Sequence, residues 1–286
     1  MYDLHLHSFC SDGDFSPHEV VERAYVKGLQ GIALTDHNGL WGIDEAQEKA
    51  HEKGIEFLSG IEISTNYNEH DVHILGFSPQ LKRSIIDDGL AKTRQGCRER
   101  IEAMVQKCQQ AGFNQVSMKA IESRYQAYQN PSFISFDVAR ELQEKHNLSL
   151  VEAHTMTVAG GICYVPYGDW LMSPSEAIAL LHSAGAIAVI AHPGITLAEE
   201  GNVLFSKLLE QLRKDHLDGI EVRHPFHTLD VVKRFSDYVA EHNLLVTAGS
   251  DWHGDSRFPE NNAQFGSIGV TEEEWINVLT RCAELA

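Results

Sequence analysis

Residues 3–8 read Asp-Leu-His-Leu-His-Ser, a short alternating stretch that a polar loop follows. Alternation over a few residues, with polar residues after it, predicts a buried strand at the start of the chain. Successive side chains of a strand point to opposite faces, so we expect His5 and His7 to point the same way. Two imidazoles on one face make a poor core and a good metal clamp. The motif alone also fits two hydrogen-bonded core histidines.

The composition is typical of one large α/β domain, with or without an insertion. The chain has 286 residues, of which 43% are hydrophobic and 22% are charged. Its five cysteines show no CxxC spacing, which predicts reduced thiols and a cytoplasmic location. The opening strand leaves no room for a signal peptide, and no apolar run approaches the roughly 18 residues of a membrane span. A formal net charge of −18 argues against tight binding of long nucleic acids but permits a small anion.

Strand and helix patterns alternate in the first and last parts of the sequence. Capping boxes at 16–19 and 173–176 open helices that glycine ends. Strands are expected at 3–7, 31–35, 57–64, 72–76, 186–191, 219–222 and 244–249. This alternation predicts parallel βα units arranged as a barrel.

The alternation breaks between residues 82 and 165. Apolar residues there recur at helical spacing, and a strand pattern returns at 160–166. We therefore expect a catalytic barrel built from 1–81 and 166–286. Residues 82–165 should form a mostly helical insertion that covers the active site.

Histidines and acids lie at the ends of the expected strands, and these ends meet on one face of a parallel barrel. The candidate metal ligands are His5, His7, Asp12, His37, Glu62, His73, His192, Asp251 and His253. One ion takes four to six ligands, so we expect two or three divalent ions, with Glu62 able to bridge a pair. Such a pocket would be net positive and should attract an anion, phosphate above all.

Seven motifs carry a resemblance to a known family. In chain order they read DLHLHS, SDG, LTDHN, GIEIS, VHILGF, IAHPG and SDWHG. The series resembles the polymerase-and-histidinol-phosphatase (PHP) family of metal-dependent phosphoesterases over 1–80 and 166–255. The resemblance implies a distorted seven-stranded (β/α) TIM-like barrel with a three-ion site of manganese, iron or zinc. The long insertion is similar to the branch that contains 3′,5′-nucleotide bisphosphate phosphatase and an RNA 5′-end-trimming exoribonuclease.

The resemblance also implies how the ligands are shared. His5, His7, Glu62 and Asp251 would hold the first ion, Glu62, His73 and His192 the second, and Asp12, His37 and His253 the third. The substrate side departs from that branch. Residues 134–140 read ISFDVAR and lack its basic pair, and Gly161-Ile162-Cys163 replaces a glycine-lysine. These departures leave the nucleotide bisphosphate assignment open and the phosphoester chemistry intact.

Six further residues are candidates for catalysis or substrate binding. Asp36 should orient a metal-bound imidazole through its second nitrogen, or else cap a strand end. Arg223, His224 and His227 follow a strand and could contact substrate, with His227 a candidate general acid. Arg94 and Arg100 match the helix pattern of the branch and could grip phosphate. The alternative for Arg223, His224 and His227 is that they are ordinary polar residues of a loop. The alternative for Arg94 and Arg100 is that they lie on a solvated helix face.

Together these features predict a metal-dependent phosphoesterase. A hydroxide that bridges two metal ions would attack a phosphate monoester, or the 5′ end of a small nucleotide or short RNA. Histidinol phosphatase and 5′→3′ exoribonuclease are alternatives within this chemistry. An amidohydrolase and a non-catalytic PHP module are alternatives outside it. Asp36-His37 and Asp251-x-His253 fit a third metal site better than a binuclear amidohydrolase plan. The sequence leaves the native metal and the oligomeric state open.

Overall fold

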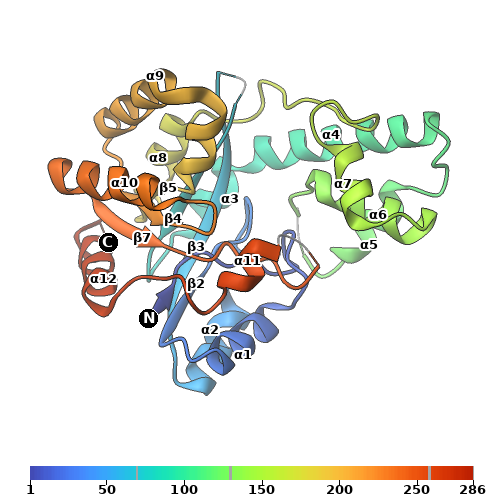
Figure 1. Cartoon of the computed structure of the whole chain (residues 1–286). Helices are drawn as coiled ribbons and strands as arrows, with labels where there is room; N and C mark the ends of the chain where they lie inside the picture. The colour runs from blue at the N-terminus through green and yellow to red at the C-terminus, as the bar shows by residue number, and fades with distance from the viewer. Residues whose placement is uncertain (69, 129–130, 257–258, 286) are drawn as a thin grey trace.

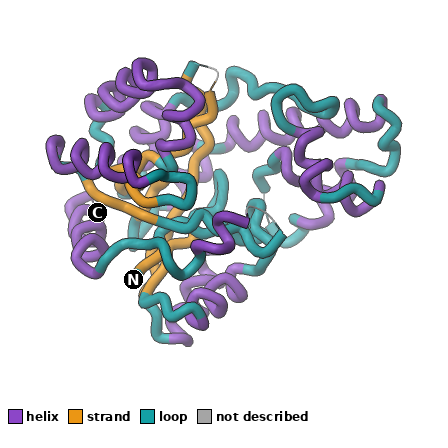
Figure 2. Tube along the Cα trace, viewed as in Figure 1, coloured by secondary structure: helices purple, strands orange, loops and turns teal. Residues whose placement is uncertain are grey.

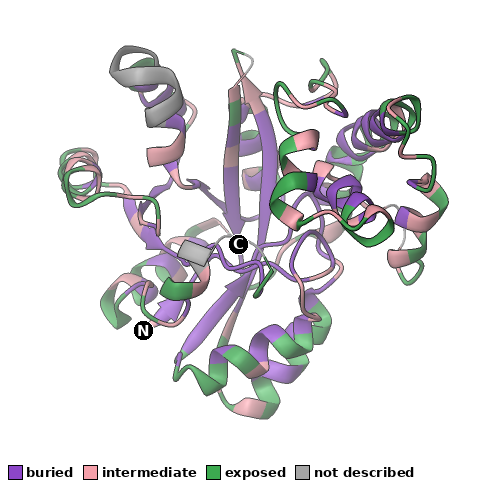
Figure 3. Ribbon diagram, turned by 45° about the vertical axis from the view of Figure 1, so that its right-hand side comes forward, coloured by how far each residue is buried: buried purple, intermediate pink, exposed green. Residues whose placement is uncertain are grey.

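Seven strands follow one another in chain order around a single sheet (Figure 1). The structure is a computed structural model that describes residues 1–68, 70–128, 131–256 and 259–285. The strands are β1 (Tyr2–Asp3), β2 (Gly31–Leu34), β3 (Glu56–Tyr67), β4 (His70–Phe77), β5 (Ile187–Ile190), β6 (Gly219–Arg223) and β7 (Leu245–Ala248). Strands β2 and β5 are buried along their whole length, as expected for strands with helices outside and a filled interior. Figure 3 shows the strands at the middle of the molecule mostly in purple, the colour of buried residues.

The ring of strands closes between β1 and β7. The amide of Leu4 donates to the carbonyl of Ala248 at 3.1 Å, and Leu6 forms a parallel bridge with Trp252. The strand predicted at 3–7 is shorter than expected, because only Tyr2 and Asp3 lie in a regular ladder with β2. Beyond Asp3 the backbone makes some hydrogen bonds with the segment after β2 and others with β7 and the segment after it. The carbonyl of Leu6, for example, accepts from the amide of Thr35.

One strand breaks the parallel rule. Strand β4 runs antiparallel to both β3 and β5, whereas the other neighbouring pairs in the sheet are parallel. The β3–β4 hairpin pairs Ser64 with His73 and so returns His73 to the end of β3 near Glu62. The antiparallel β3–β4 hairpin is what makes this barrel depart from a regular, all-parallel (β/α) barrel. The expected fold, a distorted seven-stranded α/β barrel with a helical insertion, is confirmed.

Helices cover the outside of the barrel. They are α1 (Pro17–Val26), α2 (Ile43–Lys53), α8 (Pro174–Ser183), α9 (Pro193–Lys214), α10 (Leu229–His242), α11 (Pro259–Gln264) and α12 (Glu272–Leu285). Helices α1 and α8 begin with the capping boxes that the sequence predicts: Ser16 with Glu19, and Ser173 with Glu176. These fixed helix starts set the βα connections that lead back to the next strand.

The insertion forms a helical group beside the barrel (Figure 2). Its helices are α3 (Arg83–Gly89), α4 (Ala91–Gln110), α5 (Met118–Arg124), α6 (Ser135–His146) and α7 (Leu150–Thr157). Helices α4 to α6 bury a core of their own, which includes Ile101, Met104, Phe136 and Leu142. Ile86 and Leu90, at α3, belong instead to the core of the barrel. The boundaries expected from the sequence, 82–165 against 1–81 and 166–286, stay a proposal.

Three smaller expectations concern the rest of the chain. The strand expected at 160–166 is wrong, since these residues form turns and irregular backbone; the Cys163 amide folds back onto the Met156 carbonyl. All five cysteines are free, as the sequence predicts, and all five are buried. Within the described part of the chain, no helix is both long and apolar enough to cross a membrane.

Candidate metal centre

Glu62, on β3, lies at the centre of five imidazoles. Its Oε2 is 3.3 Å from His5 Nε2, 3.2 Å from His7 Nε2 and 3.3 Å from His37 Nδ1. Its Oε1 is 2.8 Å from His73 Nδ1 and 3.0 Å from His192 Nε2. Burial alone would raise the pKa of Glu62, but the surrounding histidines, His37 and His73 foremost, hold it well below its usual range. Each carboxylate oxygen therefore faces a different group of nitrogens, as a bridging ligand requires.

Four residues form the innermost group of donors. They are His5, His7, Glu62 and Asp251, all buried, with ligand atoms within 4.8 Å of one another. Asp251 Oδ1 is 3.4 Å from His5 Nε2 and 3.2 Å from His7 Nε2. Two donors that are each about 2.1 Å from one tetrahedral ion would be about 3.4 Å apart. These spacings therefore suit a single ion held by the four residues.

A second group of donors stands on the other side of Glu62. Its members His37, Glu62 and His73 have ligand atoms within 4.8 Å of one another. His192 reaches the same carboxylate oxygen as His73, from the start of α9. The sequence resemblance implied Glu62, His73 and His192 for this position. The geometry brings these three residues together and adds His37.

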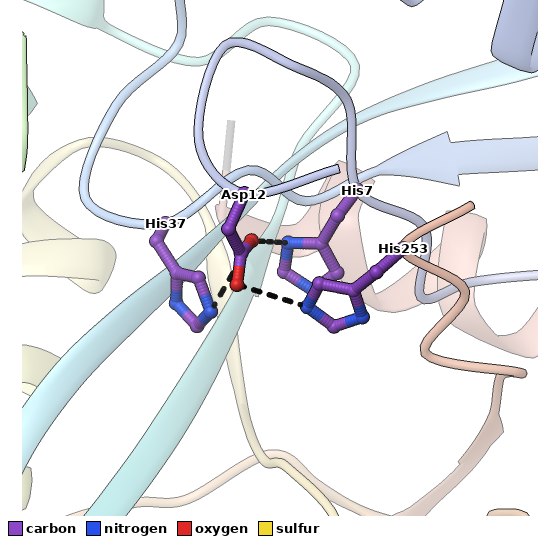
Figure 4. Close-up of side chains that lie close together, drawn as sticks. All are labelled: His7, Asp12, His37 and His253. Carbon is purple, nitrogen blue, oxygen red and sulfur yellow. Dashed lines mark ion pairs between the residues drawn. The ribbon is translucent and has the colours of Figure 1, made fainter. Parts of the chain in front are cut away.

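The third group gathers around Asp12 (Figure 4). Asp12 Oδ2 is 3.3 Å from His253 Nε2, and Oδ1 is 3.6 Å from His7 Nδ1 and 3.9 Å from His37 Nε2. Asp12 lies on the loop after β1, and His253 on the loop after β7, so the group spans the closure of the barrel. All four residues are buried.

The donor set fits divalent metal ions. Buried polar atoms in proteins almost always have partners, so unpartnered ones need a physical reason. Within the described residues, the buried atoms that lack a hydrogen-bond partner include His5 Nε2, both ring nitrogens of His7 and His37 Nδ1, each within 3.6 Å of a carboxylate oxygen of Glu62 or Asp12. Imidazole nitrogens without a partner, placed against carboxylates, are what transition-metal ions bind in proteins.

The PHP domain matches residues 3–214 of this sequence. The chain belongs to the PHP family. Its sequence is 33% identical over 255 residues to a 3′,5′-nucleoside bisphosphate phosphatase of Chromobacterium violaceum, covering 88% of this chain and 86% of that one. It is 32% identical over 254 residues to a 5′-3′ exoribonuclease of Haemophilus influenzae, covering 88% and 89%.

A solved structure is similar over nearly the whole length. A protein of Bifidobacterium adolescentis, described as a metal-dependent phosphoesterase, superposes with a TM-score of 0.85 at 29% identity. The match covers 98% of this chain and 96% of the other. The predicted family and reaction class are thereby confirmed: this PHP protein is a metal-dependent phosphoesterase, a hydrolase of ester bonds.

Strained backbone surrounds the PHP centre. Three non-glycine residues beside or within the ligand cluster have positive φ: Asn38 at 54°, His192 at 28° and Asp251 at 50°. Such conformations cost free energy and persist where surrounding contacts enforce them, often at active sites. At His192 the enforcing contact is Glu221, whose Oε2 accepts from the His192 amide at 2.6 Å.

Sequence reasoning missed two carboxylates that support the ligands. Glu221, on β6, is fully buried, and its Oε1 is 3.0 Å from His5 Nδ1. It therefore fixes which nitrogen of His5 faces the centre. Asp71 Oδ1 is 3.2 Å from His73 Nε2 and can do the same for that ring. Glu221 is a lone acid on β6, so only its position in the fold reveals the contact. Asp71 lies two residues before His73 on β4, so strand alternation was the signal that could have found it.

The structure changes the interpretation of Asp36. We expected its carboxylate to orient a metal-bound imidazole. Its hydrogen bonds instead come from the Ser8 amide at 2.8 Å and from the Ser8 and Ser11 hydroxyls, both at 2.6 Å. Asp36 thus holds the start of the loop that carries Asp12, and a role in orienting a metal-bound imidazole stays a prediction.

Two of the three candidates after β6 make contacts that the sequence did not predict. His227 Nδ1 lies 2.9 Å from the Val222 carbonyl, and its Nε2 accepts from the Gly194 amide, also at 2.9 Å. Burial lowers the pKa of His227 to about 4, and both ring nitrogens contact backbone groups; a general-acid role for His227 stays a prediction. Arg223 forms a bidentate ion pair with Glu274 and also donates to the Gly269 carbonyl; its contact with substrate stays a prediction.

His224 is the third, and it does lie at the centre. Its Nε2 is 3.3 Å from Asp251 Oδ2, and its ring centroid is 5.4 Å from that of His192. His224 is buried and contacts Asp251 Oδ2, the carboxylate oxygen opposite the one that faces His5 and His7, so it can hold that carboxylate in place. A direct contact with substrate stays a prediction.

The two arginines of α4 contact backbone rather than the ligand cluster. Arg94 donates to the carbonyls of Asn38 and Asp87, and lines a cavity of about 800 Å³ between barrel and insertion. Arg100 donates to the Val165 carbonyl and lies 4.1 Å from the centre of the Tyr167 ring. Their roles in substrate binding stay predictions.

Proposed function

We propose that this PHP protein removes a terminal phosphate from a small nucleotide-like substrate. Two or three divalent ions, of manganese, iron or zinc, would be held by the nine ligands expected from the sequence. The observation that carries the proposal is Glu62, whose two oxygens each face a separate set of histidine nitrogens. When bound, the ions supply Lewis acidity and a water of lowered pKa.

The chain's own residues prepare the reaction geometry. Glu62 separates the metal positions, and Glu221 holds both the His5 ring and the His192 backbone. Because these contacts exist before substrate arrives, the ligands need little rearrangement during turnover. Asp12, Glu62 and Asp251 supply three negative charges, fewer than two or three dications bring, so the pocket favours an anionic phosphate group.

The size of the pocket supports a phosphate end group. The cavity over the ligands has a volume of about 230 Å³ and is also lined by Ile195 and Thr196. Pockets that enclose whole small molecules have roughly 300 to 1,000 Å³. We therefore place the reacting phosphate inside this cavity and the rest of the substrate outside it.

The nucleotide part of the proposal rests on the relatives. The C. violaceum relative is named for a nucleoside bisphosphate and the H. influenzae relative for 5′-3′ cleavage of RNA. Trimming of short RNA 5′ ends is accordingly the second candidate. Arg94 is the candidate contact for the part of the substrate outside the metal pocket, since it is buried and borders the larger cavity.

The test combines metal content with turnover. The purified protein should contain manganese, iron or zinc and should hydrolyse p-nitrophenyl phosphate with manganese. His7→Ala and Glu62→Ala should reduce that rate by at least roughly a hundredfold, because each removes a ligand shared by two positions. His51→Ala, which alters an exposed histidine of α2, is the matched control. Undiminished turnover in both ligand variants would refute the proposal.

A substrate panel then separates the candidates. It contains 3′-phosphoadenosine 5′-phosphate, histidinol phosphate, a 5′-phosphorylated oligoribonucleotide and a cyclic amide. The proposal predicts the highest kcat/KM with the bisphosphate nucleotide. Preference for the oligoribonucleotide would select RNA trimming, and preference for histidinol phosphate or the amide would refute the nucleotide assignment.

A further inference from the structure

The helical insertion holds the loop that carries Asp12. Tyr125, at the end of α5, has its hydroxyl 2.8 Å from the Ser11 carbonyl. Arg140, on α6, donates through Nη2 to the carbonyls of Asp12 at 3.2 Å and Gly13 at 2.9 Å. Two side chains from the insertion therefore fix the backbone on both sides of the Asp12 carboxylate.

The same contact continues to the loop that carries His253. Arg140 Nη2 is 3.0 Å from Asp14 Oδ1, and Asp14 in turn accepts from the Ser256 amide at 2.7 Å and hydroxyl at 2.6 Å. The Asp14 amide also donates to the His253 carbonyl at 2.7 Å. Arg140 is thus the first member of a chain of contacts that joins the insertion to two ligand-bearing loops.

A third ligand loop is contacted by α4. Arg94 Nη1 donates to the carbonyl of Asn38, the residue after His37. Contacts from the insertion therefore reach the loops of Asp12, His253 and His37, which are the loop-borne members of the third ligand group. In the innermost group, by contrast, His5 and Glu62 are held by the barrel itself, through the β1 segment, β3 and Glu221.

This difference matters because loops place ligands less rigidly than strands do. A metal site needs its donors within a few tenths of an ångström of their ideal distances. Asp36 fixes the start of the Asp12 loop, at Ser8 and Ser11, from inside the barrel. The other end of the loop, from Asp12 to Asp14, is fixed by Arg140.

We propose that Arg140 and Tyr125 are positioning residues for the third metal position, through which the insertion sets the affinity of the ion at Asp12 and His253. The proposal rests on the metal-dependent function proposed above and adds a role for the insertion. Occupancy of the third position then depends on the docking of α5 and α6. Occupancy of the position at His5 and Glu62 does not.

The experiment counts metal ions rather than only turnover. Metal-free protein is titrated with Mn²⁺ by calorimetry, and bound manganese is counted by mass spectrometry after dialysis. The variants are Arg140→Met, which keeps a long side chain over Phe136, and Tyr125→Phe, which removes one oxygen. We expect one class of Mn²⁺ site to weaken by roughly 10- to 100-fold in Arg140→Met, and less in Tyr125→Phe, while the tighter sites are unchanged.

Arg98→Met is the matched control. Arg98 is an arginine of the same insertion, and its ion pairs with Glu102 and Glu122 stay within the insertion. Excess Mn²⁺ should restore turnover in Arg140→Met but not in Asp12→Ala, because only the latter lacks a ligand. Should Arg140→Met unfold, Tyr125→Phe decides the question by the same titration.

Two outcomes are distinguishable failures. If the wild-type protein binds none of Mn²⁺, Fe²⁺ and Zn²⁺, the proposed function fails. If the wild-type protein binds Mn²⁺ and both variants match its stoichiometry and affinities, only the role of the insertion is refuted.

Discussion

Replacing Glu221 by glutamine should weaken metal binding, although Glu221 is not itself one of the nine expected metal ligands. The carboxylate makes two contacts: Oε1 with the His5 ring at 3.0 Å and Oε2 with the His192 amide at 2.6 Å. Both partners are donors. An amide side chain offers one oxygen and one NH₂ group, so one of the two donors must face another donor.

The size of the effect follows from these contacts. A buried hydrogen bond to a charged group is worth about 1.5–3 kcal/mol. At about 1.4 kcal/mol per factor of ten, its loss corresponds to roughly 10- to 100-fold in affinity. Supporting partners of metal-bound histidines show the same range when they are removed. The strained backbone of His192 adds to the effect, because Glu221 is the contact that holds it.

The assay measures p-nitrophenyl phosphate hydrolysis against Mn²⁺ concentration. In Glu221→Gln the half-saturating Mn²⁺ concentration should rise roughly 10- to 100-fold, with turnover partly recovered at saturation. Glu274→Gln is the control, since Glu274 pairs with Arg223 and should leave the Mn²⁺ dependence within about twofold of wild type. An unchanged Mn²⁺ dependence in Glu221→Gln would refute the supporting role of Glu221.

Two further predictions concern residues outside the ligand set. Burial raises the pKa of Asp137 to about 6 from 3.8, so the folded state binds its proton more tightly than the unfolded state. The stability advantage of wild type over Asp137→Asn in urea should therefore fall by about 2.4 kcal/mol as the pH rises from 4 to 7; parallel pH curves would contradict this. His227→Phe leaves the Gly194 amide without its acceptor and should cost about 1–3 kcal/mol of unfolding free energy, without moving the alkaline limb of the pH–rate profile. Loss of that limb would support His227 as a general acid.

The ligand cluster could be predicted from the sequence because strand ends converge in a barrel whatever the details of packing. His37 and His192 needed only the correct order of strands to be placed beside Glu62. The antiparallel β4 does not upset this result, since its hairpin still returns His73 to the same region.

The supporting residues could not be predicted, because their contacts depend on local backbone irregularities. Glu221 and Arg223 are two apart on β6, so simple alternation places them on one face. The ladder between β6 and β7 shifts register between these two residues. Glu221 consequently reaches His5, whereas Arg223 pairs with Glu274. The contacts of His227 with Val222 and Gly194 similarly depend on how one loop folds over another.

The parallel bridge between Leu6 and Trp252 joins segments from opposite parts of the sequence. His7 follows Leu6 in the chain and Asp251 precedes Trp252, and His7 Nε2 lies 3.2 Å from Asp251 Oδ1. An ion bound to both would act as a non-covalent cross-link between distant segments, and such a link favours the folded chain because it is absent once the chain unfolds. Chelation should therefore promote opening at this bridge first, and protease cleavage near residues 8–14 would report it.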